Sequence, residues 1–180
     1  MNGSGANALS YLVGTLIDLY VAAILLRLLL QWVRADFYNP LCQFLVKVTN
    51  PVLVPLRRVI PSIRRLDTAS VVLMLALEVV NVWFINLISS NEMTFLQIVV
   101  FSAIKLVMTL LVTYFFLIIV AVIVSWIGQR MHHPAIPLVY QLTEPVLKPF
   151  RRIIPPIAGI DLSPLFALIA IRFLILLLGW

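Results

Sequence analysis

Ionisable and polar side chains interrupt the most apolar stretches of this sequence, namely Asp18, Arg27, Glu78, Asn81 and Arg172. A charged side chain at the centre of a bilayer costs about 2.5–3.5 kcal/mol on insertion scales, so such groups usually pair, face water or line a path. The chemistry open to these residues is therefore ion pairing inside the membrane, or passage of an ion or small solute.

A second set of charged residues belongs to an internal repeat. Residues 51–61 are PVLVPLRRVIP and residues 145–155 are PVLKPFRRIIP, with eight of eleven positions identical at a constant offset of 94. Asp67 and Asp161 follow at the same offset. A repeat of this length indicates two copies of one supersecondary unit.

The repeated motif contains prolines and paired arginines: Pro51, Pro55, Arg57, Arg58, Pro61, Pro145, Pro149, Arg151, Arg152 and Pro155. Arginine forks bind carboxylates and phosphates, so the arginines are predicted to face a partner protein or phospholipid headgroups. Prolines interrupt helices, so each motif is predicted to form a broken, shallow hook. Asp67 and Asp161 are predicted to cap the following helices, with a binding role as the alternative.

The elements that position these residues follow from composition. The chain is 63% hydrophobic and 11% charged, with a mean hydropathy of +1.11. Stretches at about 9–33, 68–89, 98–127 and 162–180 are apolar and long enough to cross a bilayer, which takes roughly 20 residues of helix. The sequence therefore predicts an all-α integral membrane protein with four transmembrane helices.

The four spans are predicted to form two parallel hairpin repeats, residues 1–94 and 95–180, each with an amphipathic interfacial connector. In the first connector an apolar stripe falls at helical spacing, and its counterparts in the second repeat follow the same pattern. These residues are Leu41, Phe44, Leu45 and Val48, with Ala135, Leu138, Val139 and Leu142.

Basic residues predict the orientation. Ten of the thirteen Lys and Arg residues lie in the two connectors, which are therefore expected to be cytoplasmic, with both termini outside. The first span lacks the features of a cleaved signal peptide. The net charge of +6 comes from the basic residues of the two connectors, so nucleic acid is not predicted as a direct partner.

Glu78 and Arg172 occupy equivalent positions under the offset of 94, and they are predicted to form an ion pair with Asn81 one turn away. Asp18 and Arg27 point to opposite faces of one helix, and Arg27 and Lys105 are expected to extend toward the headgroups. Ser102, Thr109 and Thr113 share a polar stripe with Lys105. Two interpretations remain open: the polar residues join the helices, or they line a transport path.

Catalytic and cofactor motifs are not found. Cys42 is the single cysteine, and His132 with His133 forms a surface pair unsuited to chelating one metal. No phosphate-binding loop or nucleophile motif occurs. The sequence therefore predicts neither an enzyme nor a cofactor.

The doubled motif, followed by Asp67 and Asp161, resembles the YggT/YlmG family over nearly the whole chain. The resemblance implies a two-repeat bacterial inner-membrane protein without known enzymatic activity. Relatives are associated with cell division or nucleoid distribution, with cytochrome assembly in plastids, and with tolerance of osmotic stress. The motif residues above carry the resemblance, but Ala158 and Gly159 replace Arg64 and Arg65, so the two connectors are not fully equivalent.

The expected function is to bind or help assemble other integral membrane proteins, with anionic phospholipid headgroups as a further partner. The alternative is a transport component for an ion or small osmolyte that uses Glu78, Arg172 and Asp18. An enzyme acting on lipids is a more distant third hypothesis.

Overall fold

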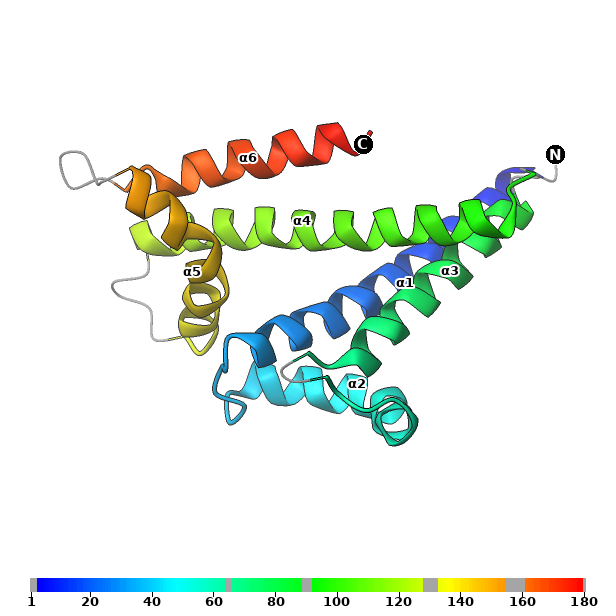
Figure 1. Cartoon of the computed structure of the whole chain (residues 1–180), viewed down its shortest axis with the longest axis horizontal. Helices are drawn as coiled ribbons and strands as arrows, with labels where there is room; N and C mark the ends of the chain where they lie inside the picture. Colours follow the sequence, from blue (N-terminus) through cyan, green and yellow to red (C-terminus); the bar gives the residue numbers. More distant parts are fainter. Residues whose placement is uncertain (1–2, 64–65, 89–91, 128–132, 155–160, 180) are drawn as a thin grey trace. The chain divides into compact units, whose positions relative to one another are not determined.

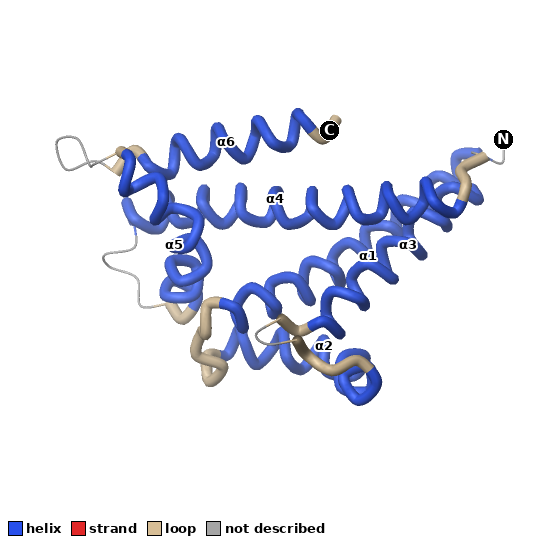
Figure 2. Tube along the Cα trace, in the orientation of Figure 1, coloured by secondary structure: helices blue, strands red, loops and turns tan. Residues whose placement is uncertain are grey.

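The computed structural model describes residues 3–63, 66–88, 92–127, 133–154 and 161–179, and six α-helices lie within these ranges (Figure 1). The helices are α1 (Gly3–Trp32), α2 (Pro40–Val59), α3 (Thr68–Ile88), α4 (Phe95–Ile127), α5 (Ala135–Ile153) and α6 (Ser163–Leu177). Figure 2 shows the helices in blue and the described loops in tan, and the described part of the chain contains no β-strand beyond the isolated bridge of Ile63 and Leu66. The predicted helical class is confirmed.

Three helices are long and apolar enough to cross a membrane: α1, α3 and α4. They match the first three predicted spans. The fourth prediction, at 162–180, corresponds to α6, which is apolar but only 15 residues long. A helix rises 1.5 Å per residue, so α6 alone is shorter than the roughly 30 Å hydrocarbon core.

The connectors are continuous helices rather than broken hooks, which corrects the prediction made from their prolines. Pro51 and Pro55 lie inside the 20-residue α2, and Pro145 and Pro149 lie inside α5. All four prolines are exposed. Their missing N–H groups and any local bend therefore fall on the outer side of each helix, where packing does not oppose them.

Each connector helix buries one side against its own unit. In α2 the buried side chains are Cys42, Thr49 and Leu53, whereas Phe44 of the predicted apolar stripe is 62% exposed. The stripe thus lies on the outer surface of α2, available to lipid. In α5 the buried residues are Leu138, Val139, Leu142, Thr143 and Leu147.

The chain divides into two compact units. Unit 1 contains residues 1–28 and 45–107, and unit 2 contains residues 29–44 and 108–180. The predicted repeat boundary at residue 94 falls inside unit 1, because the first part of α4 packs there. The division into repeats at 94 and 95 stays a prediction.

In unit 1, α1 and α3 approach closely at Gly14. A Cβ atom at this position would lie 3.2 Å from the side-chain oxygen of Asn81, and Gly14 itself is buried. Small residues allow such approaches between helices in membranes. Gly14 therefore holds α1 at the distance at which its polar residues reach α3.

We expect Gly14→Leu to lower the stability of unit 1 by roughly 1–3 kcal/mol, because the larger side chain overpacks the helix contact. Gly14→Ala should cost less. Gly5→Leu is the matched control, since nothing lies within 4 Å of a Cβ atom there. Thermal unfolding in detergent measures all three variants. An unfolding temperature of Gly14→Leu equal to that of Gly5→Leu would contradict the α1–α3 contact.

Candidate functional site: paired connectors and a charged cluster

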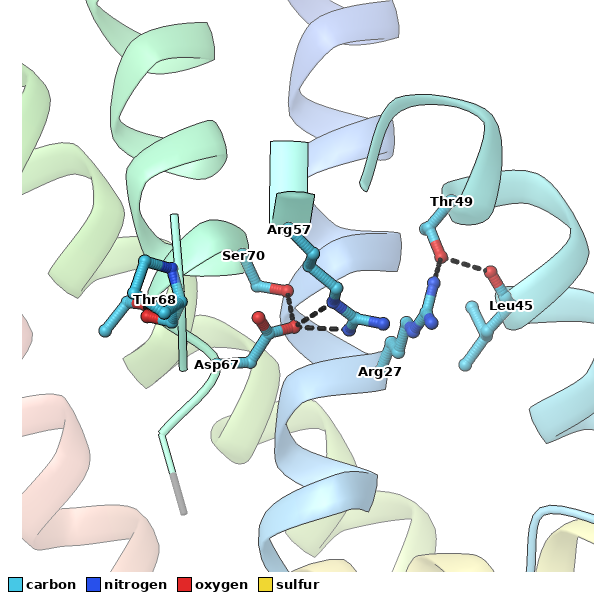
Figure 3. Close-up of polar contacts among 8 residues, drawn as sticks. Arg27, Leu45, Thr49, Arg57, Asp67, Thr68 and Ser70 are labelled. Atoms are coloured by element: carbon cyan, nitrogen blue, oxygen red, sulfur yellow. Dashed lines mark hydrogen bonds and ion pairs between the residues drawn. The ribbon is translucent and has the colours of Figure 1, made fainter. Parts of the chain in front are cut away.

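Arg57 near the end of α2 binds Asp67, which precedes α3 (Figure 3). Arg57 Nε lies 3.2 Å from Asp67 Oδ2, and the terminal Nη2 contacts the same oxygen. Ser70 Oγ donates to Oδ2 as well, at 2.5 Å. The Asp67 side chain is only 1% exposed, so this ion pair ties α2 to the start of α3 inside the protein.

The chain between the two partners turns back sharply. α2 ends at Val59, and Ile63 and Leu66 then exchange two backbone hydrogen bonds of 3.1 and 3.0 Å. This isolated bridge returns the backbone toward α2 before α3 begins. Eight residues, 60–67, connect the two helices, and Arg57 lies in the last turn of α2, so a spacing of ten residues brings Arg57 and Asp67 together.

The Asp67 carboxylate is held in its charged form. Burial alone would raise its pKa, but hydrogen bonds from Arg57 and Ser70, together with the Arg57 charge, hold the pKa below its usual value. A buried carboxylate with these partners stabilises the ionised state. Asp67 was predicted to cap α3, and its described contacts add an ion pair that the cap hypothesis did not include.

Unit 2 contains the equivalent pair. Arg151 Nε of α5 lies 2.8 Å from Asp161 Oδ2, and the Ser163 backbone N–H donates to Asp161 Oδ1 at 2.9 Å. Arg151 also binds Glu144 Oε2 at 2.5 Å. Burial would raise the Asp161 pKa, but Arg151 and Ser163 lower it, and the two carboxylates raise the Arg151 pKa against the effect of burial. This pair is more exposed, with both side chains near 40%.

These pairs add a second role to two motif arginines. Arg57 and Arg151 were predicted to face a partner or headgroups; each binds an aspartate of its own unit while 31% and 39% of its side chain stay exposed, so the predicted role stays a prediction. Arg58 and Arg152 are exposed and belong to none of the ion pairs described above. Of the other motif positions, Pro61 is exposed after α2, whereas Pro155 lies outside the described residues.

Arg27 lies in the interior rather than toward the headgroups. It is 6% exposed, and its Nη1 donates to Thr49 Oγ1 at 2.5 Å (Figure 3). Thr49 in turn donates to the Leu45 carbonyl at 2.6 Å. Arg27 therefore joins α1 to α2, and the expectation that it extends outward is wrong.

A second polar group, the unit 1 cluster, lies among the spanning helices and consists of Asp18, Glu78, Asn81 and Lys105. Lys105 Nζ is 2.5 Å from Asp18 Oδ1 and 2.9 Å from Glu78 Oε2. The Asn81 amide donates to Asp18 Oδ1 at 2.8 Å. Glu78 and Asn81 are fully buried, whereas the Asp18 side chain is 45% exposed.

The unit 1 cluster corrects two expectations. Lys105 does not extend away from its helix toward the headgroups, because it lies between Asp18 and Glu78. These two carboxylates, which nothing in the sequence placed together, therefore share one cation. Arg172, the predicted partner of Glu78, is exposed on α6 of the other unit, so that ion pair stays a prediction.

The remaining candidate residues serve local structure. Ser102 Oγ donates to the Ile98 carbonyl at 2.7 Å, and Thr113 Oγ1 donates to the Thr109 carbonyl at 2.6 Å. His133 Nδ1 accepts from the Ala135 N–H at the start of α5, while His132 lies outside the described residues. In the part of the chain that the structure describes, no three acidic, His or Cys residues form a metal-binding group.

The two Arg–Asp pairs were not predicted, although the sequence contains a signal for them. Both repeats place an arginine and an aspartate ten residues apart, so opposite charges recur at the same spacing. The pairing of Lys105 had no comparable signal, because its counterpart in the first repeat is Tyr11. Chemically, these groups hold helices together, and they lack a nucleophile beside a general base.

Comparisons with known proteins agree with this arrangement of two similar halves. The family model described as CCB3/YggT matches residues 6–88 and 100–180. An uncharacterized protein of Vibrio alginolyticus is 43% identical over 178 residues, covering 96% of this chain and 94% of the relative. An uncharacterized protein of Pseudomonas aeruginosa is 40% identical over 166 residues, covering 91% of this chain and 84% of the relative.

The uncharacterized protein YggT of Escherichia coli K12 is 38% identical over 160 residues, covering 88% of this chain and 82% of the relative. No solved structure matches the chain.

We predict that Arg57→Gln destabilises the protein more than Arg151→Gln does. Removing Arg57 leaves Asp67 buried without its cation, which costs on the order of 2–3 kcal/mol. Asp161 is accessible to solvent, so its loss of Arg151 should cost roughly 1 kcal/mol or less. Thermal unfolding in detergent compares the two, with Arg58→Gln as the control. Equal losses at positions 57 and 151 would contradict the difference in burial.

The same pair predicts a pH dependence. A carboxylate whose pKa is depressed by folding contributes stability that is fully present above its unfolded pKa and is lost as the pH falls through the folded pKa. The stability gap between the wild type and Asp67→Asn should therefore be constant from about pH 7 to 5 and narrow below about pH 4. Unfolding measured across this range gives the gap directly. A gap that widens in acid would contradict the assignment.

Proposed function

The chain belongs to the CCB3/YggT family, and on that premise we propose that it is a non-enzymatic membrane protein that binds and helps assemble other membrane proteins. The supporting observation is that both units tie an amphipathic connector helix to the next helix through one Arg–Asp pair. Such pairing fixes the direction of α2 and α5 and leaves an exposed arginine on each. Rigid, oriented helices suit a binding surface.

Arg58 and Arg152 are the proposed contact residues, at the ends of α2 and α5. Their guanidinium groups are free of the internal pairs described above and can bind carboxylates of a partner or phosphates of anionic lipids. Exposed apolar residues such as Phe44 and Val52 accompany Arg58 on α2. A surface that combines arginine with apolar side chains is typical of helices that lie at a membrane interface.

We further propose four spans in a bacterial inner membrane, with the connectors cytoplasmic and both termini outside. The bias of Lys and Arg toward the connectors supports this orientation. Leu178 and Gly179 form a turn after the 15-residue helix, so α6 alone is shorter than the hydrocarbon core. The bilayer thins locally around short spans at modest cost, which allows α6 to cross.

A second candidate function is transport of an ion or small osmolyte, and the unit 1 cluster favours it. Glu78 is fully buried, and its Oε1 has no hydrogen-bond partner among the described residues. A buried carboxylate oxygen of this kind is a candidate site for a proton or another cation. Asp18, which is half-exposed and binds the same Lys105, would be the point at which the ion enters.

Complementation of a strain that lacks the protein separates the two functions. We predict that Arg58→Gln with Arg152→Gln abolishes function and co-purification of partners while the protein still accumulates, because both side chains are exposed. Lys47→Gln with Lys148→Gln is the control, since it removes two exposed positive charges from the same helices. Normal function of the double arginine variant, together with an inactive Glu78→Gln at matched protein level, would favour transport and reject assembly.

Single cysteines test the orientation. In a Cys42→Ala background, we expect Glu92→Cys and a cysteine appended at the C-terminus to react with an impermeant thiol reagent applied from outside, and Ser62→Cys to react only after the membrane is opened. Ser62 and Glu92 are both exposed, so burial does not protect them. Labelling at Ser62 alone would reverse the orientation. Protection of the C-terminal cysteine alone would show that α6 does not cross.

A further inference from the structure

Unit 2 contains a cavity of about 580 Å³ between α4, α5 and α6. Its lining includes the polar side chains of Arg151, Asp161 and Tyr140 together with apolar side chains such as Ala121 and Leu165. The cavity lining can be compared with the first repeat, because each lining residue has a counterpart 94 positions earlier. Arg151 and Asp161 correspond to Arg57 and Asp67, and Ala121 corresponds to Arg27.

In unit 1, the arginine at this position fills the corresponding space. Arg27 is buried, bonds to Thr49 and interacts electrostatically with Arg57 and Asp67. In unit 2, Thr143 is buried like Thr49, but the side chain that would reach it is reduced to the methyl group of Ala121. The cavity therefore lies where the first repeat places a cation.

Charge at this point also differs between the units. Unit 1 brings together two cations and one carboxylate: Arg27, Arg57 and Asp67. Unit 2 brings together one cation and two carboxylates, because Arg151 binds both Asp161 and Glu144, and residue 50 at the position equivalent to Glu144 is a neutral asparagine. The second repeat thus lacks a base at the cavity, and its additional acid, Glu144, binds Arg151 of the cavity lining.

We propose that this cavity binds a phospholipid whose headgroup carries a primary ammonium, as in phosphatidylethanolamine. The ammonium takes the place of the missing guanidinium beside Asp161, and the acyl chains follow Leu165 and the adjacent apolar wall of α4 and α6. The inference rests on the proposed position of α5 at the membrane interface. An amphiphile fits a cavity lined by both charged and apolar side chains better than a small cation does.

Lipid retention by the full-length protein in lipid-free detergent tests the proposal by native mass spectrometry. The probes are dioleoyl phosphatidylethanolamine, its phosphatidylcholine analogue, whose quaternary ammonium has no N–H, and its phosphatidylglycerol analogue, which has no ammonium. We expect wild-type protein to retain phosphatidylethanolamine about tenfold more tightly than either analogue, since charge-assisted hydrogen bonds distinguish them. Equal retention of the three lipids would overturn the proposal.

Ala121→Arg places in unit 2 the side chain that unit 1 already has, so it should remove the preference for phosphatidylethanolamine. Asp161→Asn should reduce the preference, because it removes the carboxylate that lines the cavity, and it decides the question if Ala121→Arg does not fold. Lys148→Gln, which removes an exposed charge of α5 outside the cavity lining, is the control. Unchanged preference in Asp161→Asn or in folded Ala121→Arg would overturn the proposal.

A photo-crosslinking amino acid at Leu165, which lines the cavity and is 53% exposed, identifies the occupant in membranes. Cross-linking to lipid supports the proposal. Cross-linking to a protein would overturn it, and a basic side chain of that protein would then take the place assigned to the ammonium. The tests of the cavity and of the binding surface can be told apart. Variants of the cavity should lose the lipid preference while partners still co-purify, whereas the variant of Arg58 and Arg152 should lose partner co-purification while the lipid preference stays.

Discussion

The ion pair between a connector arginine and the aspartate that follows it determines how each connector lies against its unit. Because Arg57 in the last turn of α2 binds Asp67, which precedes α3, α2 cannot rotate or slide relative to α3 without leaving a buried carboxylate unpaired. This position of α2 places Thr49 against Arg27, so α1 is joined to the same connector. The Arg151–Asp161 pair repeats the arrangement in unit 2 with greater exposure to solvent, and it therefore restrains α5 less strongly.

The sequence predicted the helices better than it predicted the contacts between them. Hydropathy and length identified α1, α3 and α4 because the exclusion of charge from a bilayer acts on whole segments of about 20 residues. The prolines of α2 led to the wrong prediction of a broken segment. Each exposed proline removes one backbone hydrogen bond, but the burial of Leu53 between them maintains the helix. The contact of Lys105 with Asp18 joins residues 87 positions apart, and such pairing depends on how α1 and α4 pack, which periodicity does not reveal.

The two repeats keep the same ion pair but differ around it. Arg27 becomes Ala121, and Asn50 becomes Glu144, so unit 1 has an occupied, well-packed contact where unit 2 has a cavity and an additional carboxylate. If both copies of a duplicated unit served stability alone, a cavity in one copy would bring no benefit, because a cavity removes packing contacts. The difference therefore favours a division of tasks, in which unit 1 supplies rigidity and unit 2 supplies a surface that accepts another molecule.

The unit 1 cluster has the opposite character from the connector pairs. It contains two carboxylates and one ammonium, and Glu78 lies at the fully buried end while Asp18 lies at the more exposed end. A purely structural cluster at this depth would be more stable with equal numbers of acids and bases, because an uncompensated charge is costly in a low dielectric. Asn81 offsets part of this cost by donating to Asp18, while Lys105 Nζ lies 2.5 Å from Asp18 and 2.9 Å from Glu78. The amide thus joins α3 to α1 through the same carboxylate that joins α1 to α4, so three helices depend on the position of Asp18.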